Sequence, residues 1–276
     1  MSPGTRTRRA LLWVAVHATA VAVALMFLAP LLFITLTALM SDRQALSDDL
    51  WPDGWHFENF VEVFSGDMVR WTINSTMYAA LSTVFMLVSS VPVAYALARF
   101  RFRGRNTALV VVISAMMLPP QVTMVPLYIV WARLDLTGTL WPLIIPQLFG
   151  DAFSIFLLRQ FLVTIPREYA DAARVDGCGE FRTMLRVILP MAKPALAAVA
   201  LFQFFYCWND YFRPLVYADP DHWTLAIGVA TFRAAHEVEW NLTMAATLLT
   251  ILPVLIVFFL AQRVFIQGVT LTGVKG

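Results

Sequence analysis

The chain has 276 residues, of which 59% are hydrophobic and 14% charged, and its mean hydropathy is +0.70. This composition is too apolar for a soluble domain and predicts an all-α polytopic membrane protein. The net charge is only +2. Cys178 and Cys207 lie far apart with no CxxC or Cys/His neighbour, which argues against a disulfide framework and against a metal site.

Six apolar segments are long enough for membrane spans of roughly 20 residues each. The first runs from Leu11 to about Met40 after a basic start. It exceeds the roughly 7–15 apolar residues of a signal peptide, so we expect a retained span. The other spans are expected at 71–98, 108–131, 140–162, 195–216 and 242–264.

The third expected span contains Pro119, Pro120 and Pro126 and should be bent or broken. Two interpretations stay open. The break is a hinge that moves during transport, since broken helices line cavities in transporters, or it is a static kink that helps packing.

Charge is distributed unevenly over the segments between the spans. Six spans put both termini on one side, and the inter-span segments on that side carry most of the basic residues. The positive-inside rule then predicts that both termini are cytoplasmic, as is the segment between spans four and five. Fifteen of the 20 basic residues lie on the predicted cytoplasmic side, namely Arg6, Arg8, Arg9, Arg99, Arg101, Arg103, Arg105, Arg159, Arg167, Arg174, Arg182, Arg186, Lys193, Arg263 and Lys275.

No internal repeat or flexible linker divides the chain, so we expect one membrane domain with three parts. Residues 1–70 hold the N-terminal tail, the first span and an acidic outer loop, which we interpret as a peripheral addition to the core. Residues 71–265 hold a core of five spans with a cytoplasmic loop at 164–194, and 266–276 form a cytoplasmic tail.

The loop at 164–194 is the one long polar segment in the second half of the chain. Thr164 is predicted to cap a helix that has Pro166 in its first turn. Gly177 and Gly179 indicate a helix end and a turn. Helix-compatible charge pairs are expected between Asp171 and its neighbours three and four residues away, Arg174 and Arg167.

Small residues at 170, 173 and 177 would form a line on the first helix of this loop that permits close approach to another element. A second helical piece is expected from Glu180 toward Pro190, with Phe181, Leu185 and Ile188 on one face. Physical chemistry alone leaves two interpretations open. The segment is a basic amphipathic linker on lipid headgroups, or it is a docking helix for a soluble partner.

Several motifs in this loop and beyond it resemble a known family. Asp171-Ala172-Ala173, Asp176-Gly177 and Ile188-Leu189-Pro190 are similar to the EAA-type coupling loop of carbohydrate-type ABC importer permeases. Asp171 stands where Glu is usual, and Cys178 where Ala is usual. The resemblance extends over nearly the whole chain, through Asn74-Ser75, Ala94–Arg99, Leu118-Pro119, Pro126-Leu127-Tyr128, Trp208-Asn209-Asp210 and the ending Leu271–Gly276.

The resemblance implies the type I importer permease fold and the role of the second, shorter permease of a maltose-type system. In such systems the loop, here centred on 166–180, docks on a separate ATPase. Glu168, Asp171, Ala172, Ala173, Asp176 and Gly177 would form this docking element. Gly273, Val274 and Lys275 in the tail would reach the ATPase dimer interface.

The resemblance also implies the partners. They would be a second permease subunit in a heterodimer, a dimer of ATP-binding subunits, an extracellular solute-binding protein and membrane lipid, with no nucleic acid. The chain would lie in the cell membrane of a prokaryote. Because it has no GxxxxGK[ST] phosphate loop, we expect no cofactor on this chain and ATP hydrolysis by the partner.

Two rival function classes are weaker. No HExxH or GxSxG motif occurs and the four histidines have no metal-ligand spacing, so we expect no enzyme. A secondary transporter would not need the docking loop, and such transporters usually contain inverted repeats. The expected substrate is a di- or oligosaccharide, and a glycerol-phosphate-type substrate is the alternative within the family.

Polar residues inside the expected spans are candidates for the transport pathway. Asp151 and Gln147 lie about halfway along span four, and Asn209 and Asp210 lie in the outer half of span five. For Asn209 and Asp210 a structural or gating role is favoured over substrate contact. For Asp151, a pathway role and a role as interhelical hydrogen-bonding residue are equally supported. Pro119 and Pro126 are further gating candidates.

Overall fold

The computed structural model describes residues 3–234 and 239–273, with side chains for 11–232 and 239–262. Every regular element in these ranges is helical. Four helical segments are long and apolar enough to cross a membrane, and two bent helix pairs bring the number to six if each pair is one span. The six predicted spans correspond to these six segments.

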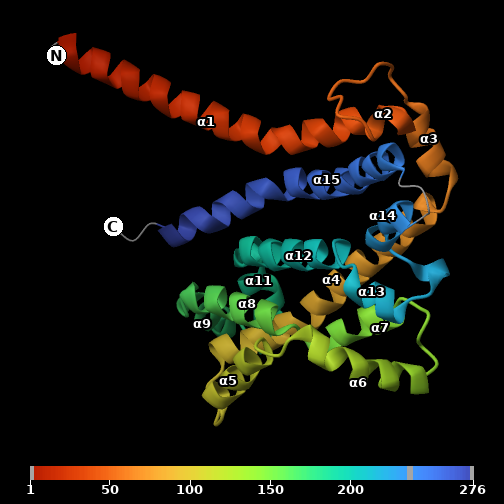
Figure 1. Cartoon of the computed structure of the whole chain (residues 1–276). Helices are drawn as coiled ribbons and strands as arrows, with labels where there is room; N and C mark the ends of the chain where they lie inside the picture. Colours follow the sequence, from red (N-terminus) through yellow and green to blue (C-terminus); the bar gives the residue numbers. More distant parts are fainter. Residues whose placement is uncertain (1–2, 235–238, 274–276) are drawn as a thin grey trace. The chain divides into compact units, whose positions relative to one another are not determined.

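The helices form two compact units (Figure 1). The first unit comprises the residues up to Gly66 and Val229–Ile251. It contains α1 (Pro3–Ala38), α2 (Asp42–Ala45), α3 (Glu58–Ser65) and the N-terminal part of α15 (Trp240–Gly273). The domain boundaries predicted at residues 70 and 265 stay predictions.

A buried asparagine organises the first unit. The amide of Asn59 donates to the carbonyls of Ala38 and Met40 at 2.9 Å each, and its oxygen accepts from Asn241 at 3.2 Å. These bonds satisfy the carbonyls at the end of α1, which have no partner within the helix.

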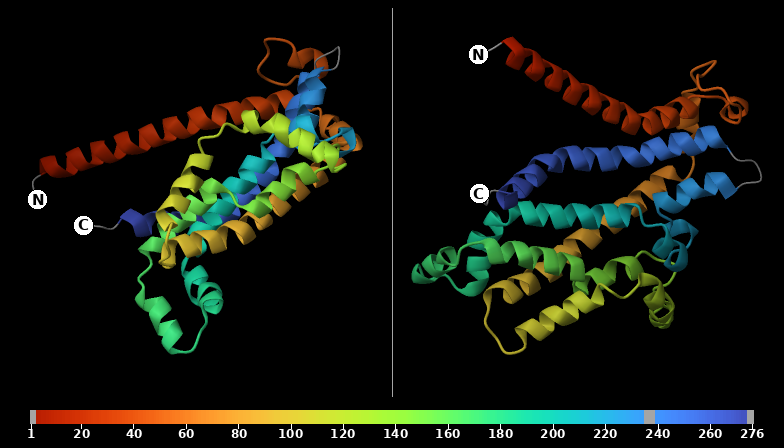
Figure 2. Two further views of the ribbon diagram at one scale, coloured as in Figure 1. Left: turned by 90° about the horizontal axis from the view of Figure 1, so that it is seen from below. Right: turned by 60° about the vertical axis from the view of Figure 1, so that its left-hand side comes forward.

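In the second unit, Asp67–Gly228 with the residues from Leu252 onward, α4 (Met68–Arg99) is the central element. It packs along α8 (Ala152–Thr164) and α12 (Lys193–Trp208), as Figures 1 and 2 show. In lipid, helices associate through close van der Waals contact, which small residues permit. The buried stripe of α4 contains such residues, namely Ser75, Ala79, Ser82, Ser90, Ala94 and Ala98.

The third predicted span is broken, as its prolines indicate. It consists of α5 (Arg105–Ala115) and α6 (Pro120–Arg133), which meet at 92°. The break ends at Pro119, which has extended backbone and precedes α6, whereas Pro126 lies inside α6. The structure thus places the break at Pro119 and leaves its function as hinge or kink a prediction.

The fourth span is interrupted at its midpoint. It contains α7 (Trp141–Ile144), the 3₁₀ turn η1 (Ile145–Phe149) and α8. Gly150 separates η1 from α8 with a φ of +91°, a conformation that favours glycine. Asp151 is the N-cap of α8 and its carboxylate accepts from the N–H of Ser154 at 2.7 Å. Asp151 therefore lies at a helix start and not in the middle of a continuous helix.

The fifth span ends earlier than predicted. Helix α12 ends at Trp208, so the expected continuation to Val216 is wrong. Asp210 accepts from the backbone N–H of Arg213 at 3.2 Å, a local bond that competes with the helical pattern. Three short helices follow, namely α13 (Phe212–Tyr217), η3 (Pro220–His222) and α14 (Leu225–Ala234).

The charged insert consists of α9 (Glu168–Val175), a turn with Gly177 at φ +79°, α10 (Glu180–Thr183), the π-helical turn η2 (Met184–Ile188) and α11 (Leu189–Met191). The prediction that Thr164 caps the first helix is wrong, because Thr164 is the last residue of α8 and its hydroxyl donates to the carbonyl of Phe161.

The predicted apolar face of the second helical piece is also wrong. Ile188 is fully buried, but Phe181 is 70% and Leu185 46% exposed. The π-helical turn contains one extra residue, which rotates Ile188 away from the face that a regular α-helix would give it. Met184 and Ile188 instead pack in the core of the unit.

Candidate functional site

Two polar regions lie at opposite ends of α4. Near its C-terminal end the Tyr95 hydroxyl donates to Glu180 of the charged insert at 3.3 Å. Near its N-terminal end the amide of Asn74 donates to the carbonyls of Asp221 and Trp223, at 3.0 Å each. At about 1.5 Å per residue, Asn74 and Tyr95 are about 30 Å apart, the thickness of a bilayer hydrocarbon core.

Ion pairs hold the turn between α9 and α10, here called the α9–α10 turn (residues 166–183). The guanidinium of Arg174 contacts Asp171 at 2.6 Å and Glu180 at 2.7 Å. The predicted pair of Asp171 and Arg174 is thus present. The hydrogen bond to Glu180 raises the pKa of Arg174, which keeps the bridge charged. Since all three side chains are about half exposed, their contribution is to the shape of the turn more than to overall stability.

The predicted docking residues divide into two faces of α9. Ala173 is 6% exposed and packs inward together with Ala170. Of the predicted line of small residues, Ala170 and Ala173 therefore face this chain's own core, whereas Gly177 is exposed. The outward-facing residues are Glu168, Asp171, Ala172, Asp176 and Gly177.

Apolar side chains lie on the outer surface of the same turn. Val175 is 88% exposed, Phe181 70% and Tyr169 49%. The left view of Figure 2 shows the turn projecting from the rest of its unit. Exposed apolar residues concentrated on a projecting turn are typical of an interaction surface. Sequence patterns did not single out Val175, and they placed Phe181 on one face together with Leu185 and Ile188.

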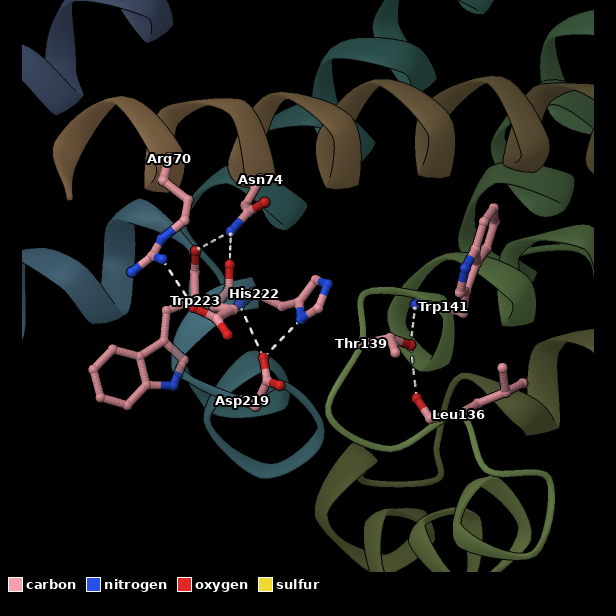
Figure 3. A network of polar contacts seen from close by, with 9 residues as sticks. Arg70, Asn74, Leu136, Thr139, Trp141, Asp219, His222 and Trp223 are labelled. Atoms are coloured by element: carbon pink, nitrogen blue, oxygen red, sulfur yellow. Dashed lines mark hydrogen bonds and ion pairs between the residues drawn. The ribbon is translucent and has the colours of Figure 1, made fainter.

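The loop at 217–224 is tied to α4, as Figure 3 shows, and it also pairs with the connection before α7. Arg70 contacts Asp221 at 2.8 Å, and Gly138 pairs with Ala218 in a parallel bridge. Desolvation opposes ionisation of Asp219, but hydrogen bonds from His222 outweigh it and lower the pKa of Asp219. These contacts explain the Asn74-Ser75 motif, since Ser75 accepts the N–H of Leu225 at 2.8 Å.

The breaks in spans four and five meet at a cavity of about 370 Å³, here called the midspan cavity. Its polar lining comprises Gln147, Asp151, Gln203 and Arg213. The first two come from η1 and the start of α8, Gln203 from α12, and Arg213 from α13. Gln147 and Asp151 are pathway candidates predicted from the sequence, and both lie at this cavity in the structure.

Arg213 connects this cavity to Asp210. Its Nε donates to the Asp210 carboxylate at 2.6 Å, and Tyr78 donates to the same carboxylate at 2.8 Å. Its guanidinium lies 4.5 Å from the ring centre of Tyr206, a cation–π contact. The side chains of Arg213 and Asp210 are 20% and 9% exposed, so the pair is largely withdrawn from water.

The guanidinium is incompletely paired. The Nη2 atom of Arg213 is buried without a hydrogen-bond acceptor in the described part of the chain. A buried donor without a partner costs about 1–3 kcal/mol, so it is an informative exception. Asn209, by contrast, donates to the carbonyl of Phe205 and does not line the cavity. The signal that sequence reasoning missed is the spacing of three residues between Asp210 and Arg213.

Of the predicted tail contacts, Gly273 is the last described residue of α15, and Val274 and Lys275 lie outside the described residues.

A helical protein with several spans, broken helices that line a cavity and a projecting loop with exposed apolar residues has the architecture of a membrane transport protein. Residues 90–271 match the family described as binding-protein-dependent transport system inner membrane component. The chain belongs to this family, whose members are permeases of ABC importers.

The chain is also similar to individual permease proteins over most of its length. The chain is 35% identical to the arabinooligosaccharides transport system permease protein AraQ of Halalkalibacterium halodurans, over 87% of this chain and 86% of the relative. It is 38% identical to the sn-glycerol-3-phosphate transport system permease protein UgpE of Pectobacterium atrosepticum, over 71% and 70%.

A solved structure supports the fold. A chain from the crystal structure of a bacterial ABC transporter involved in the import of the acidic polysaccharide alginate has a TM-score of 0.78 and 23% identity, covering 95% of this chain and 98% of that one. The predicted type I importer permease fold is confirmed.

Proposed function

We propose that this chain forms half of the translocation pathway of an ATP-driven importer for a di- or oligosaccharide, and that the α9–α10 turn docks on a separate ATP-binding subunit. The observation that carries the docking step is the outward face of this turn. There Val175 and Phe181 are 88% and 70% exposed beside Ala172, on a turn fixed by the Arg174 ion pairs.

The charge of the turn favours a protein partner over lipid headgroups. A helix that lies on anionic lipid is typically rich in Lys and Arg on its polar face. Residues 166–182 contain four carboxylates against three arginines, namely Glu168, Asp171, Asp176 and Glu180 against Arg167, Arg174 and Arg182. A mixed surface of this kind with apolar residues at its tip fits a groove in a soluble subunit.

The remaining assembly follows from the family and the charge distribution. The partners are a second permease, two copies of an ATP-binding subunit and an extracellular solute-binding protein. Both termini and the α9–α10 turn face the cytoplasm, and the outer loop at 217–224 faces the solute-binding protein. The tail at 273–275 reaches toward the ATP-binding dimer. ATP is hydrolysed by the partner and not by this chain.

The sugar assignment rests on relatives such as AraQ, named for arabinooligosaccharide transport. The similarity to UgpE, named for sn-glycerol-3-phosphate transport, keeps an anionic small substrate as the second candidate.

The test is reconstitution of the complete importer in proteoliposomes with its solute-binding protein. We expect uptake of a radiolabelled neutral oligosaccharide that requires ATP inside the vesicle and the binding protein outside. Uptake without ATP, driven by a proton or sodium gradient, would refute the proposal and favour a secondary transporter.

A further inference from the structure

The midspan cavity combines groups that recognise a hydroxylated ring. Gln147 and Gln203 supply amides that both donate and accept, and Asp151 supplies a carboxylate acceptor. Ser154 and the aromatic rings of Phe153, Phe202 and Tyr206 complete its lining. Small-molecule sites typically combine apolar and aromatic walls with a few polar groups, in volumes of about 300–1,000 Å³. At about 370 Å³ the cavity is at the small end of this range, which suits one ring more than a chain of rings.

The cavity has two features that would attract an anion, and a protein carboxylate occupies each. The N-terminus of α8 is an anion-binding position, and Asp151 caps it through the N–H of Ser154 at 2.7 Å. Arg213 is the other, and Asp210 neutralises it at 2.6 Å. A phosphate or a uronate entering the cavity would find no unneutralised cation and would face the Asp151 carboxylate.

A neutral ligand is not repelled by the Asp151 carboxylate and does not need an unpaired cation. Hydroxyl groups can accept from the Arg213 guanidinium, whose buried Nη2 has no acceptor in the described residues, and can donate to Asp151. The apolar face of a sugar ring can pack on the exposed rings of Phe153 and Phe202, which are 41% and 46% exposed.

We propose that the midspan cavity is a subsite of this chain for one neutral sugar residue, with Gln147, Asp151, Gln203 and Arg213 as its hydrogen-bonding groups. This proposal rests on the proposed import function and assigns it a contact residue set and a charge class. It excludes glycerol phosphate and acidic sugars as ligands of this cavity.

The experiment uses the complete importer in proteoliposomes with its binding protein and three probes: arabinobiose as the neutral disaccharide, glycerol 3-phosphate and digalacturonate. Gln147→Ala and Asp151→Asn should each raise the KM for neutral disaccharide uptake at least fivefold. ATPase activity stimulated by the binding protein should stay within twofold. Gln160→Ala is the matched control, because Gln160 is an exposed amide of α8 outside the cavity, and it should leave KM unchanged.

A thiol-protection measurement reports occupancy independently of turnover. In a Cys178→Ser background, the thiol of Phe153→Cys should react with a methanethiosulfonate reagent, and the neutral disaccharide should slow this reaction at least threefold during ATP turnover. The thiol of Phe149→Cys is the control, since Phe149 is 85% exposed and lies outside the cavity.

The outcomes separate the two proposals. If the wild type imports none of the probes with ATP, the proposed function fails. If it imports the neutral sugar but neither cavity variant changes KM and no protection occurs, the subsite proposal alone is overturned. Transport of an anionic probe that the Phe153→Cys thiol detects would also overturn it.

Discussion

Two adjacent alanines on α9 allow the docking surface to be tested without confusing docking with folding. Ala172 faces outward and Ala173 is 6% exposed. In the free permease, Ala172→Asp should cost about 0.5–0.7 kcal/mol, the difference in helix propensity. Ala173→Asp puts an unpaired carboxylate into the core and should cost about 3–5 kcal/mol, as for other uncompensated buried charges.

For binding of the ATP-binding subunit, Ala172→Asp is expected to have the larger effect of the two substitutions. If that subunit covers Ala172, the new carboxylate loses its water without gaining a partner, a penalty of several kcal/mol. At 1.4 kcal/mol per factor of ten, a penalty of about 3 kcal/mol weakens binding about 100-fold.

The assay is a titration of ATP-binding subunit onto the permease pair in nanodiscs, with thermal unfolding of the permease measured in parallel. Ala172→Asp should keep the wild-type Tm and lose affinity and uptake. Ala172→Ser, a small neutral control, should keep both. Ala173→Asp should lower Tm by several degrees. An affinity of Ala172→Asp within threefold of wild type would show that this face of α9 does not dock.

Three further predictions address packing, the buried ion pair and the tail. Gly228→Ala should destabilise the protein by about 1–3 kcal/mol, measured as a lower Tm in detergent, because the added methyl overlaps the Trp71 ring; an unchanged Tm would contradict this packing. Asp210→Ala should destabilise the protein by about 3–5 kcal/mol because it leaves the Arg213 charge unpaired. The double variant Asp210→Ala/Arg213→Leu should recover most of the lost Tm. If the single and double variants are equally unstable, that result refutes the pairing argument. Deletion of residues 268–276 should reduce ATP-driven uptake while membrane insertion, measured by protease protection, stays intact; unchanged uptake kinetics would count against a role for the tail.

Sequence patterns predicted the number and the approximate places of the spans, since apolar length and arginine distribution are properties of the chain itself. They located the ends of these spans less well. Span five ends at Trp208 because Asp210 bonds to the backbone of Arg213, and span four breaks at Gly150 because Asp151 caps α8. The positions of both breaks depend on single local hydrogen bonds. A hydropathy average over many residues does not detect them.

The sequence identified individual polar residues of the site, but it did not predict which of them lie together. Asp151 and Asp210 are both identifiable from sequence as polar residues in apolar segments. Arg213 on a separate short helix connects them, because it lines the cavity with Asp151 and forms an ion pair with Asp210. In the α9–α10 turn the wrong assignment of Phe181 has a similar origin. The π-helical turn adds one residue to the repeat, and no composition rule marks where this occurs.

The polar side chains of α4 explain why broken helices are tolerated beside it. Inside a membrane, backbone groups freed by a break need partners within the protein. Ser89 donates to the carbonyl of Gln147 at 2.7 Å, and Ser90 accepts the N–H of Asp151 at 3.0 Å, so α4 satisfies both sides of the break in span four.

The same helix reaches the α9–α10 turn through Tyr95 and the Asp210 carboxylate through Tyr78. The midspan cavity and the turn are thus fixed to one helix. Ser89 and Ser90 lie about 8–9 Å from Tyr95 along its axis, and Tyr78 lies about 25 Å from Tyr95. Glu180 therefore bonds to the same helix whose serines hold the cavity wall, with Pro92 lying between these serines and Tyr95.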